Sequence, residues 1–333
     1  MKAVILHKYG SPDHLELIEL DKPVPKDKEV LVKVHASSVN SWDWDILKGM
    51  PFANRLTFGL LKPKKLILGA DIAGRVEKAG IKVKHLKPGD EVFGDISGSG
   101  WGGFAEYVCA SEDVLALKPG NMSFEEAAAI PQAGVLALRG LRYKGQIEKG
   151  QKVLINGAGG GSGSFAVKFA KSFGAEVTGV DSSRKSEMLR SIGADHVIDY
   201  QKENFMKEGQ QYDMILDVVT FRSIFEYRRA LSPNGVYVML GGGSWSRVFQ
   251  GMWLGPLITL VERVSVGKAG KKMGIPIVKP NKKELILCLE ALEAGKIAPV
   301  IDRQFTLSEV PEAFRYFGEG LAQGKVVITV SKT

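Results

Sequence analysis

Alternating apolar and polar positions characterise the first third of the chain. Runs such as EVLVKVHAS and DEVFGDI are separated by turn sequences that include PVPKD, KPGD and KPGN. These runs predict β-strands, because successive side chains of a strand point to opposite faces of the sheet. Residues 1–122 are therefore expected to form a β-rich domain.

The pattern changes to helical spacing at Ser123. The sequence SFEEAAAIPQAGVLALRGL opens with a capping-box pattern formed by Ser123 and Glu126. Pro131 is expected to kink or break this helix, because proline has no backbone N–H to donate.

Strand and helix patterns then alternate from residue 153 onward. The strands VLIN, EVTGV, HVID, YDMILDVV and GVYVML alternate with helical segments such as SRKSEMLRSIG and FRSIFEYRRAL. This alternation predicts an α/β domain with a doubly wound parallel sheet that is covered on both faces. Strand character returns in IDRQFTL and KVVITV, which we expect to rejoin the first domain. The expected domains are residues 1–122 with 299–333, and residues 123–298, with a ligand-binding cleft between them.

The first strand of the parallel sheet runs directly into a glycine cluster, VLINGAGGGSG. Within it, Ala158, Gly160 and Gly163 match the spacing A-x-G-x-x-G, which is typical of a dinucleotide-binding loop between a strand and a helix. Small residues let the backbone approach a pyrophosphate, and the amides at the start of the helix favour anions. Asp181 ends the next strand, where an acid that binds the adenosine ribose is expected.

Two opposite signals bear on which nicotinamide cofactor is used. Asp181 would accept hydrogen bonds from the ribose hydroxyls and repel the 2′-phosphate of NADP(H). The next four residues, Ser182, Ser183, Arg184 and Lys185, include the cations that a 2′-phosphate requires. Asp181 favours NAD(H), and use of either NAD(H) or NADP(H) stays open.

Composition excludes several other classes of protein. The net charge of +8 comes from basic residues scattered among 37 acidic ones, which argues against nucleic-acid binding as the main role. Two distant cysteines, Cys109 and Cys288, form no disulfide framework, and the N-terminal run MKAVILHKYG is too short in apolar residues for a signal peptide. A reducing compartment, the cytoplasm, is therefore expected. The apolar segment 248–261 contains Pro256 and is too short to span a membrane, so we expect a core or dimer-contact helix there.

Several ordered strings carry a family resemblance along nearly the whole chain. They are ASSVNSWDWDILKG, LILGADIAGRVEKAG, FAEYV, SFEEAAAIPQAGVLAL, VLINGAGGGSG, RSIGADHVIDY and GKVVITV. With them the chain resembles the medium-chain dehydrogenase/reductase superfamily, and within it the zinc-independent quinone oxidoreductase branch. The resemblance implies a GroES-like β-rich catalytic domain, a Rossmann NAD(P)-binding domain and a homodimer. It also implies hydride transfer from NAD(P)H to a small-molecule quinone or α,β-unsaturated carbonyl.

The zinc ligands of related dehydrogenases are missing from the corresponding strings. Zinc-dependent relatives carry a cysteine near the SVN position and a Gly-His-Glu string near the ADIAG position. This chain has Val39-Asn40-Ser41 and Gly69-Ala70-Asp71 there, and its five histidines are scattered. Because zinc requires three or four converging Cys, His or carboxylate ligands, we expect no metal.

The resemblance also assigns roles to individual residues. Asn40 is placed beside the nicotinamide, where its amide could donate to a substrate carbonyl, or else only brace its loop. Asp43 is expected to support this site, and Trp42, Trp44 and Trp101 to offer flat apolar surface to planar acceptors or simply to pack. The residues expected at the cofactor are Asn40, Gln132, Gly134, Ala158, Gly159, Gly160, Gly161, Ser162, Gly163, Asp181, Ser182, Ser183, Arg184, Lys185, Tyr200, Gly241, Gly242, Gly243 and Lys325.

Two other functions remain open on the sequence. One is a zinc-type alcohol dehydrogenase, against which the missing ligands argue. The other is an NAD(P)H-binding protein with a structural or RNA-binding role, against which the scattered charge argues.

Overall fold

The structure is a computed structural model that describes residues 1–331 except 51, 65, 144–146, 207–208, 221, 242–269 and 277–278. The predicted helix in segment 248–261 lies outside the described residues, as do Gly242 and Gly243. The chain forms two compact units, which comprise residues 1–135, 279–290 and 298–333, and residues 136–278 and 291–297. The unit boundaries fall inside two helices, α4 (Pro131–Leu141) and α10 (Lys282–Ala294), whereas we expected a boundary at residue 122.

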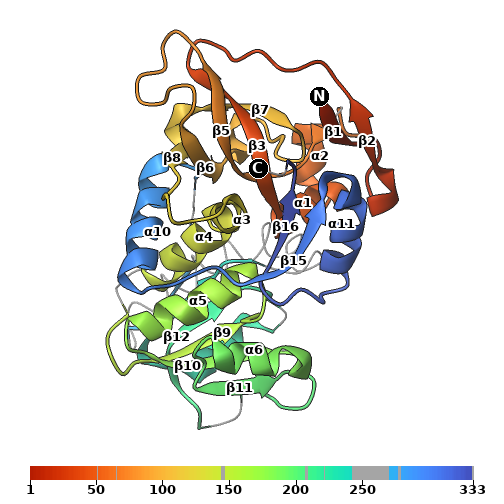
Figure 1. Ribbon diagram of the computed structural model, residues 1–333. Helices are drawn as coiled ribbons and strands as arrows, with labels where there is room; N and C mark the ends of the chain where they lie inside the picture. The colour runs from red at the N-terminus through yellow and green to blue at the C-terminus, as the bar shows by residue number, and fades with distance from the viewer. Residues whose placement is uncertain are drawn as a thin grey trace. The chain divides into compact units, whose positions relative to one another are not determined.

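The first unit is built on β-sheets. Its larger sheet has the order β15-β16-β3-β5-β6-β8, with β7 also paired to β3, and a smaller sheet has the order β2-β1-β4. The strands are β1 (Lys2–Leu6), β2 (Leu15–Glu19), β3 (Glu29–Val39), β4 (Leu66–Ile67), β5 (Asp71–Ala79), β6 (Glu91–Asp95), β7 (Tyr107–Ser111), β8 (Leu115–Leu117), β15 (Ile301–Thr306) and β16 (Lys325–Thr329). Figure 1 shows β16 from the C-terminal end lying along β3, and the register pairs Val326 with Val39 and Val327 with Ser38.

Short helices complete the first unit. They are α1 (Ser41–Lys48), α2 (Ala53–Phe58), α3 (Phe124–Ala128) and α11 (Val310–Gly318), with 3₁₀ turns at Pro12–His14, Ser97–Ser99, Glu112–Val114 and Leu307–Glu309. The capping box at the start of α3 is confirmed, because the Ser123 backbone N–H donates to the Glu126 carboxylate at 2.9 Å and the Glu126 N–H donates to Ser123 Oγ at 3.1 Å. The predicted break is also confirmed, since α3 ends at Ala128 and α4 begins at Pro131.

The second unit contains the predicted doubly wound sheet, and its strand pairs are all parallel. The strand order is β11-β10-β9-β12-β13-β14. The strands are β9 (Lys152–Asn156), β10 (Glu176–Asp181), β11 (His196–Asp199), β12 (Tyr212–Asp217), β13 (Leu231–Met239) and β14 (Lys272–Gly274), and the helices between them are α5 (Gly161–Ser172), the 3₁₀ turn Ser183–Lys185, α6 (Ser186–Ser191) and α7 (Ile224–Ala230). The chain runs from β9 outward to β10 and later returns to β12 on the other side of β9. Ligands of such sheets bind where the strand order reverses in this way, at the carboxyl ends of the strands.

Candidate active site and cofactor site

The glycine loop predicted to bind a dinucleotide lies at this reversal point, between β9 and α5 (Figure 1). A Cβ atom on Gly163 would lie 2.1 Å from the carbonyl oxygen of Gly157, so only glycine lets the helix pack this closely on the loop. Gly160, the N-cap of α5, is different, because a Cβ there would meet nothing nearer than 3.7 Å. The loop therefore has one tightly packed position and one open position, and the open position is the N-cap of α5, where helix amides suit a phosphate.

Asp181 ends β10 beside this loop and holds it in shape. Its Oδ2 accepts the Gly159 backbone N–H at 2.9 Å, and its Oδ1 accepts the Ser182 N–H at 2.9 Å. The Lys185 ammonium lies 3.5 Å from Oδ1, and both side chains are largely shielded from solvent. The carboxylate is thus hydrogen-bonded within the chain and its charge is offset by Lys185.

The remaining predicted adenosine-side residues lie at the same edge of the sheet. Ser183 and Arg184 follow β10 and are exposed. Tyr200 follows β11, and its backbone N–H donates to the Asp181 carbonyl at 3.3 Å. At the other side of β9, the carbonyl of Gly241 accepts a short hydrogen bond from the Thr220 hydroxyl.

A buried polar cluster beneath the reversal point was missed by the sequence reasoning. Asn156 at the end of β9 donates to Asp217 Oδ1 at the end of β12 at 2.8 Å. Tyr237 on β13 donates to Asp217 Oδ2 at 2.9 Å, and the backbone N–H of Thr220 donates to Oδ1 at 2.9 Å. Burial raises the pKa of Asp217, and these hydrogen bonds oppose that shift. The cluster ties together the carboxyl ends of three neighbouring strands.

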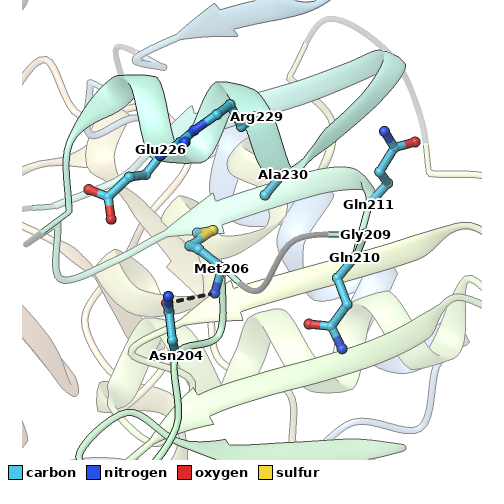
Figure 2. Close-up of a pocket in the computed structure, with 8 residues that line it drawn as sticks. All are labelled: Asn204, Met206, Gly209, Gln210, Gln211, Glu226, Arg229 and Ala230. Atoms are coloured by element: carbon cyan, nitrogen blue, oxygen red, sulfur yellow. Dashed lines mark hydrogen bonds between the residues drawn. The ribbon is translucent and has the colours of Figure 1, made fainter.

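A separate cavity of about 370 Å³ lies at the opposite edge of this sheet (Figure 2). Its lining includes Gln210 and Gln211, which immediately precede β12, and Ala230, which immediately precedes β13. The backbone N–H of Met206 donates to Asn204 Oδ1 at 3.1 Å in its wall. Because cofactors of parallel sheets bind at the carboxyl ends of the strands, this cavity is not the cofactor site.

In the first unit, Asn40 begins α1 and lies at the centre of a buried polar network. Its Nδ2 donates to Asp71 Oδ2 at 3.0 Å, and its Oδ1 accepts from the Lys325 ammonium at 2.6 Å. Lys325 Nζ also lies 3.6 Å from Asp71 Oδ2. The Lys325 side chain is only 2% exposed, so the structure places this predicted cofactor contact inside the network.

Asp71 and Asp43 anchor the network to the backbone. Asp71 Oδ1 accepts the backbone N–H of Gln132 at 3.1 Å. Asp43 Oδ2 accepts the Asn40 N–H at 2.9 Å, and its Oδ1 accepts the Gly69 N–H at 2.9 Å. Asp43 thus supports the Asn40 loop through backbone contacts.

Burial changes the acidity of every charged group in the network. It raises the pKa of Asp43 to about 7 and that of Asp95, which faces Asp71 across the β5–β6 ladder, to about 6. Burial also raises the pKa of Asp71 and lowers that of Lys325, and the attraction between these two opposes both shifts. The network can therefore change its number of protons near neutral pH. Asp71 and Asp95 were not among the predicted site residues, although an acid inside the apolar run LILGADIAG signals a buried charge.

The three predicted tryptophans do not form one surface. Trp42 and Trp101 make an edge-to-face pair with ring centroids 5.3 Å apart, and Phe58 of α2 lies 6.1 Å from Trp101. Trp44 instead packs on α11, at 6.4 Å from Phe314 and 6.3 Å from Phe317. Trp44 therefore packs apart from the pair formed by Trp42 and Trp101.

The stretches in which zinc-dependent relatives carry ligands read Val39-Asn40-Ser41 and Gly69-Ala70-Asp71 in this chain. In these stretches Asn40 and Asp71 are hydrogen-bonded to each other, Asn40 also accepts from Lys325, and Asp71 also accepts the Gln132 backbone N–H. Across the part of the chain that the structure describes, no group of three His, Cys, Asp or Glu side chains could hold a metal ion. In the same residues, no helix has the length and apolar character needed to cross a membrane.

Comparisons with known proteins match both units. Residues 26–120 match the alcohol dehydrogenase GroES-like domain, and residues 192–328 match a family described as zinc-binding dehydrogenase. The 2-methylene-furan-3-one reductase of Solanum lycopersicum is 37% identical over 98% of this chain and 79% of its own length. The chain belongs to the medium-chain dehydrogenase/reductase superfamily.

Within this superfamily the chain is similar to quinone oxidoreductases. The chloroplast envelope quinone oxidoreductase homolog of Arabidopsis thaliana is 31% identical, with 98% of each chain covered. The solved structure of the quinone oxidoreductase from Coxiella burnetii has a TM-score of 0.85 and 29% identity, with 99% of each chain covered. The predicted fold class and family are thus confirmed.

Proposed function

We propose that this medium-chain dehydrogenase/reductase transfers hydride from NADPH or NADH to quinones or α,β-unsaturated carbonyls, without a metal ion. The observation that carries the proposal is the glycine loop, with its open position at Gly160, at the reversal point of the parallel sheet. A nicotinamide cofactor bound there supplies the hydride. The names of the relatives, which include a furanone reductase, a quinone oxidoreductase homolog and an alkenal/one oxidoreductase, support the class of acceptor.

The contacts of Asp181 support the use of both cofactors. A free carboxylate at this point would repel the 2′-phosphate of NADPH. Here Lys185 offsets its charge at 3.5 Å, and the exposed Arg184 adds a cation on the same turn. These two cations therefore make binding of NADPH more favourable than Asp181 alone would predict.

Asn40 combines the two roles considered for it. Lys325 and Asp71 hold its amide in one orientation through bonds of 2.6 and 3.0 Å. Its contact with the Ser38 carbonyl is long, at 3.5 Å. This second N–H of the amide is the donor that a substrate carbonyl can recruit as negative charge develops on its oxygen.

The oligomeric state and the compartment of the protein are also part of the proposal. We propose a homodimer, the commonest symmetric assembly, that acts on a small molecule in a reducing compartment such as the cytoplasm. The two cysteines, Cys109 and Cys288, are not joined in a disulfide, which suits such a compartment.

The test is steady-state oxidation of NADPH and of NADH by protein freed of metal with a chelator. The acceptors are a naphthoquinone, a cyclic enone and an acyclic alkenal, with a secondary alcohol assayed in the oxidative direction. Turnover with a quinone or an enone is expected. Turnover with the alcohol alone, and only after zinc is added, would replace the proposal with a zinc-type alcohol dehydrogenase. Tight cofactor binding without turnover on any acceptor would favour a structural or RNA-binding protein.

A further inference from the structure

We propose that Trp42, supported by Trp101 and Phe58, selects planar cyclic acceptors such as quinones over acyclic alkenals. This inference rests on the proposed reductase function, because it concerns the acceptor side of the same site. In this proposal the exposed indole of Trp42 distinguishes planar cyclic acceptors from acyclic ones. The names of the relatives do not decide between these two classes.

The rings of Trp42, Trp101 and Phe58 form a corner in which Trp42 is the exposed ring. Trp101 is only 5% exposed, and the ring planes of Trp42 and Phe58 stand at 86° and 85° to it. Trp42 remains 41% exposed. An exposed indole backed by buried rings offers flat, electron-rich surface to an electron-poor planar ring, whereas an acyclic chain gains little from stacking.

The backbone that carries Trp101 is held in a rare conformation. Gly100, Trp101 and Gly102 have φ angles of 107°, 68° and 118°, so three consecutive residues lie in the left-handed region. For a bulky side chain this region is a true outlier, and such strain is concentrated at functional sites. The Trp101 N–H donates to the Ile96 carbonyl at 3.3 Å, and the Gly103 N–H donates to the Gly69 carbonyl at 2.9 Å, which hold the turn in place.

Asp43 connects this corner to the Asn40 network. Trp42 lies in the first turn of α1, directly before Asp43. The Asp43 carboxylate accepts the N–H of Gly69, the residue whose carbonyl holds the Trp101 turn. The same carboxylate therefore fixes both tryptophans relative to Asn40, the residue proposed to meet the acceptor oxygen.

Three variants test the proposal. Trp42→Leu removes the flat ring but keeps apolar volume, and Trp42→Phe keeps a flat ring. Trp44→Phe is the matched control on the same helix, because Trp44 packs on α11 away from the corner. The measured quantity is the ratio of kcat/KM for a naphthoquinone to kcat/KM for an acyclic alkenal.

We expect Trp42→Leu to lower this ratio by about three- to tenfold, the scale of one aromatic contact. Trp42→Phe and Trp44→Phe should leave it close to the wild-type value. An unchanged ratio in Trp42→Leu, or an equal fall of both kcat/KM values, would overturn the proposal and leave Trp42 as packing.

A binding measurement separates this inference from the proposed function. Because Trp42 is itself a fluorophore, the comparison is made between Trp42→Phe and Trp42→Leu, which both lack it and keep Trp101 as the nearby reporter. Naphthoquinone should saturably quench the remaining tryptophan fluorescence of Trp42→Phe, and most of this quenching should be lost in Trp42→Leu. Loss of quenching in Trp42→Leu would support binding of the quinone at the Trp42 ring even if no acceptor were turned over. Absence of turnover would then contradict only the proposed activity. Saturable quenching retained in Trp42→Leu would overturn binding at the Trp42 ring whatever the activity.

Discussion

The Lys325 ammonium donates to the side-chain oxygen of Asn40 at 2.6 Å and so joins β16 to the first turn of α1. The side-chain amide of Asn40 in turn donates to the carboxylate of Asp71 on β5 at 3.0 Å. Two strands, β16 and β5, and the N-cap of α1 thus meet at a buried ion pair bridged by an amide.

Replacing Lys325 should destabilise the first unit strongly. Lys325→Met leaves the Asp71 carboxylate buried without its cation, and we expect a loss of about 3–5 kcal/mol in the free energy of unfolding. Urea denaturation measures this loss. The double variant Lys325→Met/Asp71→Asn should lose clearly less than the sum of the two single variants, and strict additivity would show that the two groups do not interact.

The acidity of Asp43 should make stability depend on pH. Burial raises its pKa in the folded protein from 3.8 to about 7, so between these values the folded state keeps a proton that the unfolded state has lost. The contribution of Asp43 is therefore largest in acid and falls as the pH rises towards 7, by up to about 4 kcal/mol. Asp43→Asn should remove this part of the slope when unfolding free energies are compared at pH 4 and pH 7. Parallel pH profiles for the two proteins would contradict the assignment.

Two glycines of the loop should respond differently to substitution. Gly160→Val should fold and lose NADPH binding, because its side chain enters the open position of the loop, where a Cβ meets nothing nearer than 3.7 Å. Gly163→Ala should instead lower the melting temperature, since its Cβ would lie 2.1 Å from the Gly157 carbonyl oxygen. Thermal unfolding and cofactor titration of both variants give the comparison. Cofactor binding that survives in Gly160→Val would move the phosphate away from this loop.

Asp181 and Lys185 should shift cofactor preference in opposite directions. Asp181→Ser removes a negative charge and should favour NADPH by roughly 1–2 kcal/mol, the scale of one charge-assisted contact. Lys185→Met leaves the carboxylate uncompensated and should favour NADH. The readout is the ratio of kcat/KM for the two cofactors, and a constant ratio in both variants would exclude this pair from cofactor choice.

Local patterns predicted the elements that depend on neighbouring residues. Ser123 and Glu126 formed the expected capping box, Pro131 separated two helices, and the run ending at Asn156 became the central strand of the parallel sheet. These features follow from residue spacing within one or two turns. The spacing of Trp42 and Trp44 could also have separated these two side chains. Residues two apart on a helix do not share a face.

The contacts of the Asn40 network could not be predicted in this way. They depend on the register that sets Ser38 opposite Asp71 on β5 and opposite Val327 on β16. Register between strands so distant in sequence is decided by the packing of the whole unit. The expectation that Lys325 lies near the cofactor came from the family resemblance, and its bond to Asn40 could not be anticipated from local spacing.

The position of β16 also has a consequence for the order in which the protein can be completed during synthesis. β16 and its lysine are translated well after β3 and β5, because most of the described elements lie between them along the chain. Until then Asp71 lacks the cation of Lys325, and the part of β3 that pairs with β16, residues 36–39, has one edge unpaired, a state prone to pairing with other chains. A nascent first unit therefore stays immature until β16 has been translated, and termination before β16 would release an aggregation-prone fragment.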